Sequence, residues 1–354
     1  MKKHRHRKSM VINMKGIAKR FVYGLTAASV TVAAVYCDIP EYIMDKLAAT
    51  VFASEADSEK ITELFSLDGK DVIKSMMLYE VQEKAEPLQA AEVSKQKKEE
   101  EIPEVVPDTP AVDISHDKPA NSVESSNIIV SNTPKKQFNI NELLNRPLEY
   151  SETDGYKVLI IHTHTTESYL PNDRSENQAE NIVRVGEEFT NVLTKNGIKT
   201  LHCKTVHDAP YSKSYINELA SIEKILAEHP SIEVVIDVHR DGLYNSKNEK
   251  LRPVANINGE EAAQVMLVCG TDASGLPHET WQSCFSFALK IQSNMNKNYP
   301  NLARPINLRT ERFNTHMTKN SVIFEIGANG NTLKEAVNAA KYAAQSIADV
   351  INKK

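Results

Sequence analysis

The chain is poor in cysteine, in tryptophan and in long apolar stretches. Its 354 residues include four cysteines and one tryptophan, and no two cysteines have the CxxC spacing. This disfavours both a structural zinc ribbon and a disulfide framework, so we expect the thiols to be small buried apolar side chains. The formal net charge is only -5, and nothing in the composition therefore indicates nucleic-acid binding.

One apolar stretch follows a basic start. Residues 1–20 are rich in lysine and arginine, and the uncharged stretch Phe21–Cys37 comes directly after them. Its length is at the short end of what spans a bilayer, about 17 to 25 residues, and the basic flank places the N-terminus in the cytoplasm. We therefore expect a single transmembrane signal anchor over residues 21–38. Cleavage after a small residue such as Ala53 is the alternative.

A polar segment separates this stretch from the rest of the chain. We expect residues 39–137 to be an extracytoplasmic stalk and linker. Within it, residues 82–134 are rich in Glu, Lys, Pro and Ser and contain no aromatic residue. Such a composition buries too little apolar surface to offset the entropy lost on ordering, which predicts disorder. A single catalytic domain is then expected over residues 138–354, a length sufficient for one sizeable core.

Strand-like and helical patterns alternate in this last part of the chain. The strand-like runs are rich in apolar and β-branched residues, and the helical ones repeat apolar residues at helical spacing. Strands are expected at 157–162, 199–202, 232–238, 263–269 and 322–326, and helices at 179–195, 214–228, 281–298 and 333–353. The alternation predicts an α/β fold with a largely parallel, mixed sheet and helices on both faces.

Two of the expected strands end in histidine. The first is followed by His164 and Glu167 in YKVLIIHTHTTE, and the second ends in His239 in IEVVIDVHRDG. Catalytic groups gather at the carboxyl ends of such strands. Two imidazoles and one carboxylate are a known ligand set of catalytic zinc. The HxxE pair alone is a weak motif, but a second strand-end histidine makes a Zn2+ site formed by these three residues the favoured interpretation.

A third apolar run, SVIFEIGANGN, contains Glu325. A carboxylate is costly if it is buried alone there, and as a general base it would activate water and later protonate a leaving amine. His162 is the alternative to His164, or orients a ligand, because side chains two apart share a strand face. Arg240, next to His239, is a candidate for binding substrate carboxylates, with a structural ion pair as the alternative.

Several segments of the C-terminal part match one protein family closely. They are VLIIHTHTTESYLP, NIVRVGEEF, VHDAPYSKSY, VVIDVHRDG, AAQVMLVCGT and SVIFEIGANGNTLKEA. From Tyr156 onward the chain thus resembles the stage II sporulation protein P family of endospore-forming bacteria. The resemblance implies a zinc N-acetylmuramoyl-L-alanine amidase, which cuts the bond between the lactyl group of the glycan and the stem peptide. It also implies endopeptidase activity on peptide cross-links.

The resemblance further implies a place and partners. It predicts a membrane-anchored enzyme at the sporulation septum, whose extracytoplasmic domain degrades septal peptidoglycan during engulfment. The implied partners are the lytic transglycosylase stage II sporulation protein D and the membrane protein stage II sporulation protein M. A non-catalytic septal scaffold that recruits other wall-remodelling enzymes is the alternative.

More distantly, the domain looks like the cell-wall amidases and zinc carboxypeptidases of the phosphorylase/hydrolase-like fold. The strand-end histidine motif of the amidases falls on His164, and their catalytic glutamate falls on Glu325. The HxxE of the carboxypeptidases falls on His164 and Glu167. The carboxylate ligand of the amidases lies near the first helix, which keeps Glu180 as the alternative to Glu167.

Overall fold

The computed structural model describes residues 102, 105–107, 109–148, 150–151 and 154–353. The expected anchor over residues 21–38 lies outside the described residues, as does the first part of the expected linker. In the described part, no helix has both the length and the apolar character needed to cross a membrane.

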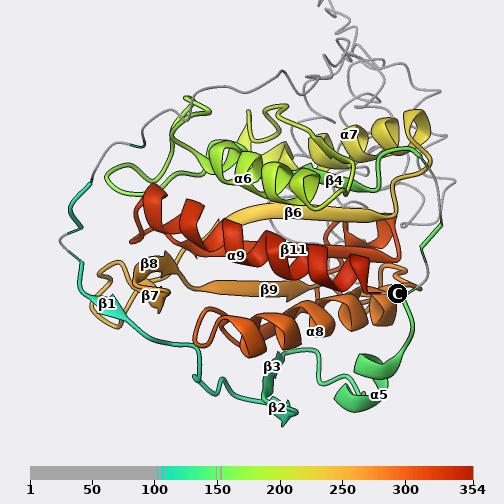
Figure 1. The fold of residues 1–354 in the computed structure, drawn as a ribbon, viewed down its shortest axis with the longest axis horizontal. Coiled ribbons are helices and arrows are strands. Elements are labelled where there is room, and N and C mark those ends of the chain that lie inside the picture. Colours follow the sequence, from blue (N-terminus) through green and yellow to red (C-terminus); the bar gives the residue numbers. More distant parts are fainter. Residues whose placement is uncertain (1–101, 103–104, 108, 149, 152–153, 354) are drawn as a thin grey trace, which may run out of the picture. The chain divides into compact units, whose positions relative to one another are not determined.

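Strands and helices alternate along most of the described chain (Figure 1). In chain order the elements are β1 (Ala111–Val112), β2 (Ser122–Ser125), β3 (Ile128–Asn132), α5 (Ile140–Asn145), β4 (Val158–Ile161), α6 (Ile182–Lys195), β5 (Thr200–His202), η1 (Tyr211–Lys213), α7 (Ser214–Glu228), β6 (Val234–Asp241), β7 (Arg252–Ile257), β8 (Glu260–Ala263), β9 (Val265–Cys269), α8 (Trp281–Asn298), β10 (Ile306–Leu308), η2 (Thr315–Met317), β11 (Asn320–Ala328) and α9 (Leu333–Asn352). Both α7 and α8 have the bounds that the sequence predicts.

The elements assemble around a mixed sheet. Within the described residues it has eight strands in the order β2-β3-β10-β9-β11-β6-β4-β5, and β1, β7 and β8 form a second, smaller sheet. Neighbours in the large sheet are parallel except for the antiparallel pairs β2–β3 and β9–β11. The expectation of a mixed α/β fold with a largely parallel sheet is confirmed.

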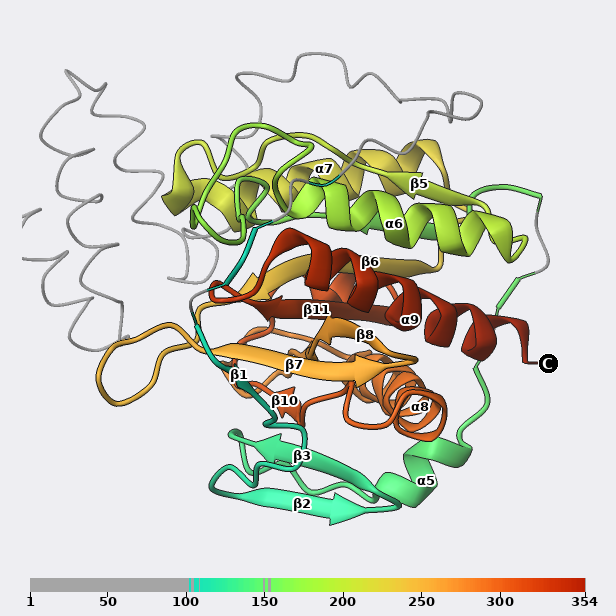
Figure 2. The ribbon, with the colours of Figure 1, turned by 60° about the vertical axis from the view of Figure 1, so that its left-hand side comes forward.

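Helices cover both faces of the large sheet. On one face α9 packs between α6 and α8, and Figure 2 shows α6 and α9 side by side. Because side chains alternate along a strand, Val158 and Ile160 of β4 join the core beneath these helices, whereas Leu159 and Ile161 join a second core. That second core includes Ile222 of α7, so α7 covers the opposite face.

The folded part begins earlier than the sequence predicts. β2 and β3 fall in the stretch that was expected to be disordered, and β3 pairs in parallel with β10. Ile128 and Val130 of β3 have no exposed surface. The prediction of disorder is therefore wrong for these strands, because this short apolar run pairs with a strand that is distant in the sequence. The boundary at residue 138 falls after β3, just before α5.

Candidate metal centre

The three predicted metal ligands meet at one edge of the large sheet. His164 and Glu167 follow the carboxyl end of β4, and His239 lies near the carboxyl end of β6. His164, Glu167 and His239 each offer one ligand atom, and these atoms lie within 4.8 Å of one another. All three residues are buried, and the ring centroids of the two histidines are 5.3 Å apart. No other group of three or more such side chains has this spacing in the part of the chain that the structure describes.

A turn after β4 brings His164 and Glu167 to the same place. The strand ends at Ile161, and the backbone N–H of Glu167 donates to the carbonyl of His164 at 3.0 Å. Asp208 holds the turn, since its Oδ2 accepts both the N–H of Thr166 at 3.1 Å and the hydroxyl of Thr166 at 2.6 Å. The turn is thus fixed by side-chain hydrogen bonds, which places both ligand side chains toward β6.

His239 is oriented by a carboxylate on its own strand. Its Nε2 lies 2.7 Å from Oδ2 of Asp237, and its Nδ1 faces Oε2 of Glu167 at 3.6 Å. Residues two apart on a strand share a face, which makes this contact local. Metal-ligating histidines commonly bond a carboxylate through the second ring nitrogen. Asp237 was not among the predicted site residues, although the DVH spacing in the sequence carries the signal.

The carboxylates around His239 determine its protonation. Burial opposes protonation of His239, but the charge and hydrogen bond of Asp237, followed by those of Glu167, raise the pKa of His239 well above its usual value. Burial raises the pKa of Asp237, but the charge of His239 and hydrogen bonds from His239 and Thr163 outweigh this and lower it to about 2. A divalent cation would supply the positive charge that a protonated His239 otherwise supplies.

One ring nitrogen of His164 is available as a metal ligand. Its Nδ1 is buried and has no hydrogen-bond partner among the described residues. Burial, with a smaller contribution from His239, lowers the pKa of His164, so the ring is neutral at neutral pH. A neutral imidazole with a free buried lone pair, next to a second imidazole and a carboxylate, is a donor set that fits zinc.

Glu325 lies directly beside His239. β11 and β6 run parallel with these two residues paired. Oε2 of Glu325 is buried and has no hydrogen-bond partner within the described chain. Burial raises the pKa of Glu325 to about 8, and the charges of Asp241 and Glu167 act in the same direction. A carboxyl group whose pKa lies near neutral pH can both accept a proton and return it.

The two alternative ligands lie outside the group. Nδ1 of His162 is 2.9 Å from the carbonyl oxygen of Val238, and its Nε2 is 2.8 Å from Nε2 of His202. His162 faces α6, where a Cβ on Gly186 would come within 2.6 Å of its ring, so only glycine fits there. Glu180 is exposed and accepts from Asn177 at 2.9 Å. The expectation that His162 and His164 share a face is wrong, because β4 ends at Ile161.

Arg240 makes structural contacts. Its Nε donates to the carbonyl of Ser168 at 2.8 Å, and its Nη2 donates to the carbonyl of Asp173 at 2.7 Å. Its backbone N–H donates to Oε2 of Glu167 at 3.1 Å. The guanidinium thus ties the segment after Glu167 to β6 through backbone carbonyl oxygens, and substrate binding by Arg240 stays a prediction.

Two exposed tyrosines border the group on the side of α7. The ring of Tyr211 stacks on His164 with centroids 4.5 Å apart, and the guanidinium of Arg174 lies 4.5 Å from the Tyr211 centroid. Tyr215 meets the His164 ring edge-on at 5.6 Å. The exposed fractions are 55% for Tyr211 and 38% for Tyr215. Sequence reasoning did not find this aromatic border, because only the fold brings η1 and the start of α7 next to the turn after β4.

Comparison with known proteins gives the chain its family. The family model of Stage II sporulation protein P (SpoIIP) matches residues 58–348. The chain belongs to the stage II sporulation protein P family. A curated SpoIIP relative, Stage II sporulation protein P of Bacillus subtilis (strain 168), is 26% identical over 235 residues. The match covers 61% of this chain and 56% of that relative, so it spans little more than half of the relative's length.

Solved structures with some similarity to this SpoIIP chain are amidases. The N-acetylmuramoyl-L-alanine amidase AmiC2 of Nostoc punctiforme has 12% identity and a TM-score of 0.35, covering 56% of this chain and 96% of that one. The CwlD amidase from Clostridioides difficile, in complex with the GerS lipoprotein, has 14% identity and a TM-score of 0.34, covering 56% and 97%. These scores are too low to say anything about the metal centre.

Proposed function

We propose that this chain is a zinc-dependent N-acetylmuramoyl-L-alanine amidase that degrades septal peptidoglycan during engulfment in sporulation. One observation carries the proposal. Glu325, whose Oε2 is buried with no hydrogen-bond partner among the described residues, is paired with His239 on the neighbouring strand and thus lies beside a buried group of two histidines and one glutamate. Family membership supports the sporulation setting, and the geometry supports hydrolysis.

His164, Glu167 and His239 would hold the zinc ion. When bound, zinc would lower the pKa of a water molecule and polarise the scissile carbonyl. The chain's own residues supply the rest. Asp237 keeps Nε2 of His239 protonated and leaves its Nδ1 facing Glu167. The backbone of Arg240 holds the Glu167 carboxylate in place.

Glu325 would carry the proton. With a pKa raised to about 8 by burial, its carboxylate form would accept a proton from the attacking water. The resulting acid would then donate that proton to the leaving amine, and an amide bond needs such a donor because an amide anion is a poor leaving group. Tyr211 and Tyr215 would form the wall against which the substrate rests.

The biological context forms part of the same proposal. The substrate would be peptidoglycan with its stem peptides, and the chain would be held at the membrane through residues 21–38. It would work with stage II sporulation protein D and stage II sporulation protein M at the septum. Family membership supports this context.

Digestion of purified peptidoglycan by the full-length chain tests the activity. The reaction is run with and without a metal chelator, and the products are read by mass spectrometry. Chelator-sensitive release of intact stem peptides from uncut glycan is the expected result. Trimmed or uncrosslinked peptides that remain on glycan would assign a peptidase instead. Absence of any product from a zinc-loaded chain would favour the scaffold alternative.

A further inference from the structure

A chain of buried hydrogen bonds runs from α7 to His239. Oγ1 of Thr163 lies 2.7 Å from Oε2 of Glu218 and 2.7 Å from Oδ2 of Asp237. The same Oδ2 lies 2.7 Å from Nε2 of His239. The exposed fractions of Glu218 and Thr163 are 2% and 0%. The histidine is therefore connected to a second carboxyl group that lies outside the metal-ligating group.

The number of protons available restricts the charges of the two carboxyl groups that these hydrogen bonds connect. The Thr163 hydroxyl has a single proton, so it donates to one of the two carboxyl groups and must accept from the other. Apart from that hydroxyl, Glu218 accepts only from the amide of Asn314 in the described chain, whereas Asp237 accepts from both the N–H of Thr163 at 3.0 Å and His239. These two bonds stabilise the ionised form of Asp237. The remaining carboxyl, Glu218, is then the one that donates to Thr163.

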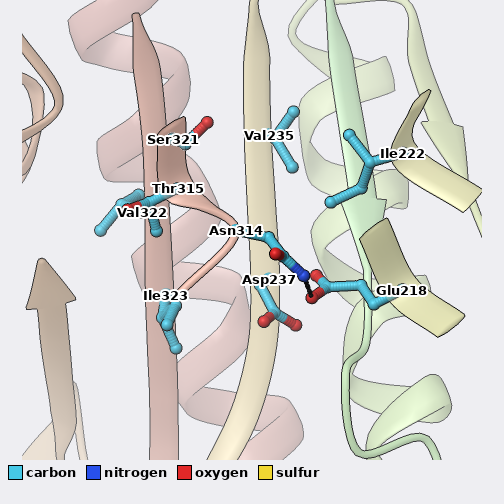
Figure 3. A pocket seen from close by; sticks show the side chains of 9 residues that line it. All are labelled: Glu218, Ile222, Val235, Asp237, Asn314, Thr315, Ser321, Val322 and Ile323. Atoms are coloured by element: carbon cyan, nitrogen blue, oxygen red, sulfur yellow. Dashed lines mark hydrogen bonds between the residues drawn. The ribbon is translucent and has the colours of Figure 1, made fainter. Parts of the chain in front are cut away.

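The surroundings of Glu218 also favour a neutral acid. The amide of Asn314, whose Nδ2 donates to Oε2 at 2.7 Å, by itself favours the ionised form, but burial and the charge of Asp237 outweigh this bond. Figure 3 shows Glu218 reaching from α7 toward Asp237 on β6, with apolar Ile222 and Val235 lining the same small cavity. Burial and the charge of Asp237 raise the pKa of Glu218 to about 8.

We infer that Glu218 is a positioning residue that acts as a neutral carboxylic acid, donating through Thr163 to Asp237 and thereby fixing the orientation of His239. Each bond in the chain then has a defined direction, from Glu218 to Thr163, from Thr163 to Asp237 and from His239 to Asp237. With Nε2 bonded to Asp237, Nδ1 on the side of Glu167 is the nitrogen that would give its lone pair to a bound metal ion. The inference rests on the proposed function of this group as a metal centre.

The hydroxyl of Thr163 offers the sharpest test of the connection. We would measure the zinc dissociation constant of the full-length chain by competition with a chromophoric chelator. Thr163→Val removes the hydroxyl and should weaken zinc binding about 10- to 100-fold, as loss of partners behind metal ligands typically does. Thr163→Ser keeps the hydroxyl and should restore binding to near the wild-type value. Thr190→Val is the matched control, because within the described chain the hydroxyl of this buried threonine bonds only the carbonyl of Gly186.

The protonation state of Glu218 can be measured separately by infrared spectroscopy. Infrared spectra of the wild type and Glu218→Gln at neutral pH should differ by the carbonyl band of one buried carboxylic acid. The absence of that band, or a Thr163→Val variant that binds zinc like wild type, would overturn the inference and leave the amidase proposal intact. A wild-type chain that binds no zinc would instead overturn the metal centre, and the infrared band would still report on Glu218.

Discussion

Glu325 and His239 occupy paired positions on the parallel strands β11 and β6, and Oε2 of Glu325 is buried with no hydrogen-bond partner in the described chain. Glu325→Gln keeps the shape of the side chain but removes its ability to take a proton. We expect peptidoglycan hydrolysis to fall about 100- to 10,000-fold, the usual range for a lost general base. Zinc content should stay at the wild-type level, because the three grouped ligands are unchanged.

Glu180→Gln is the control for that variant. Its side chain is exposed, and its carboxylate accepts from the local partners Asn177 and Ser175. We expect its hydrolysis rate and zinc content to match the wild type. Full activity of Glu325→Gln would show that the general base has been assigned to the wrong residue. Loss of zinc from Glu180→Gln would show that Glu180, not Glu167, is the carboxylate ligand.

His164 and His162 should respond differently to substitution. His164→Ala removes a member of the metal-capable group, so we expect zinc content after gel filtration to fall to background in elemental analysis. His162→Asn should keep its zinc, because its ring bonds Val238 and His202 instead. It should lose stability, by about 1–3 kcal/mol, since it leaves buried partners unsatisfied. Normal zinc in His164→Ala and none in His162→Asn would reverse the assignment.

The choice between these histidines shows where sequence reasoning ends. Apolar runs predict the two strand ends that carry His164 and His239, and the ligand preferences of zinc predict which side chains bind the metal. Strict alternation, however, put His162 and His164 on one face. The structure separates them because β4 ends at Ile161 and a turn held by Asp208 follows. That turn depends on a residue more than forty positions away, which periodicity does not detect.

Long-range pairing explains the other omissions. The sequence pattern does not single out Asp237, because this residue lies inside an apolar strand. It does not single out Glu218 either, because only the packing of α7 brings that residue to Thr163. β2 and β3 were assigned to a linker because their neighbours along the chain are polar, whereas their partner β10 lies far away in sequence. By contrast, α7 and α8 are set by local periodicity, and their bounds were predicted correctly.

Stability should depend on pH through Glu218. Its pKa is raised from the ordinary 4.5 to about 8 by burial, so the folded state binds a proton that the unfolded state has released between these values. The stabilisation of the folded state by this proton is complete below about pH 4.5 and is lost as the pH rises through 8. The free energy of unfolding should therefore fall with pH in this window, by up to about 1.4 kcal/mol per pH unit.

Urea unfolding in the presence of a chelator, at a series of pH values, measures this effect. Glu218→Gln has no titrating group at this position, so its unfolding free energy should decline less steeply than that of the wild type. The difference between the two proteins cancels the other titrating groups, His162 among them. Parallel pH profiles would mean that Glu218 is ionised in the folded state.

The N-terminal strands should be needed for stability but not for the metal centre. A chain that starts at residue 138 lacks β1, β2 and β3. It loses the pairing with β10 and the burial of Ile128 and Val130. Burial of two such side chains contributes about 3–6 kcal/mol, so the melting temperature should drop markedly. A chain that starts at residue 105 keeps these strands and serves as the control.

The metal centre should not depend on these strands. Because β4 and β6 lie at the other end of the strand order, the zinc affinity of the folded fraction should be equal in both truncated chains. Equal melting temperatures would contradict the structural role of β3, and a selective loss of zinc affinity would show that these strands support the metal centre itself.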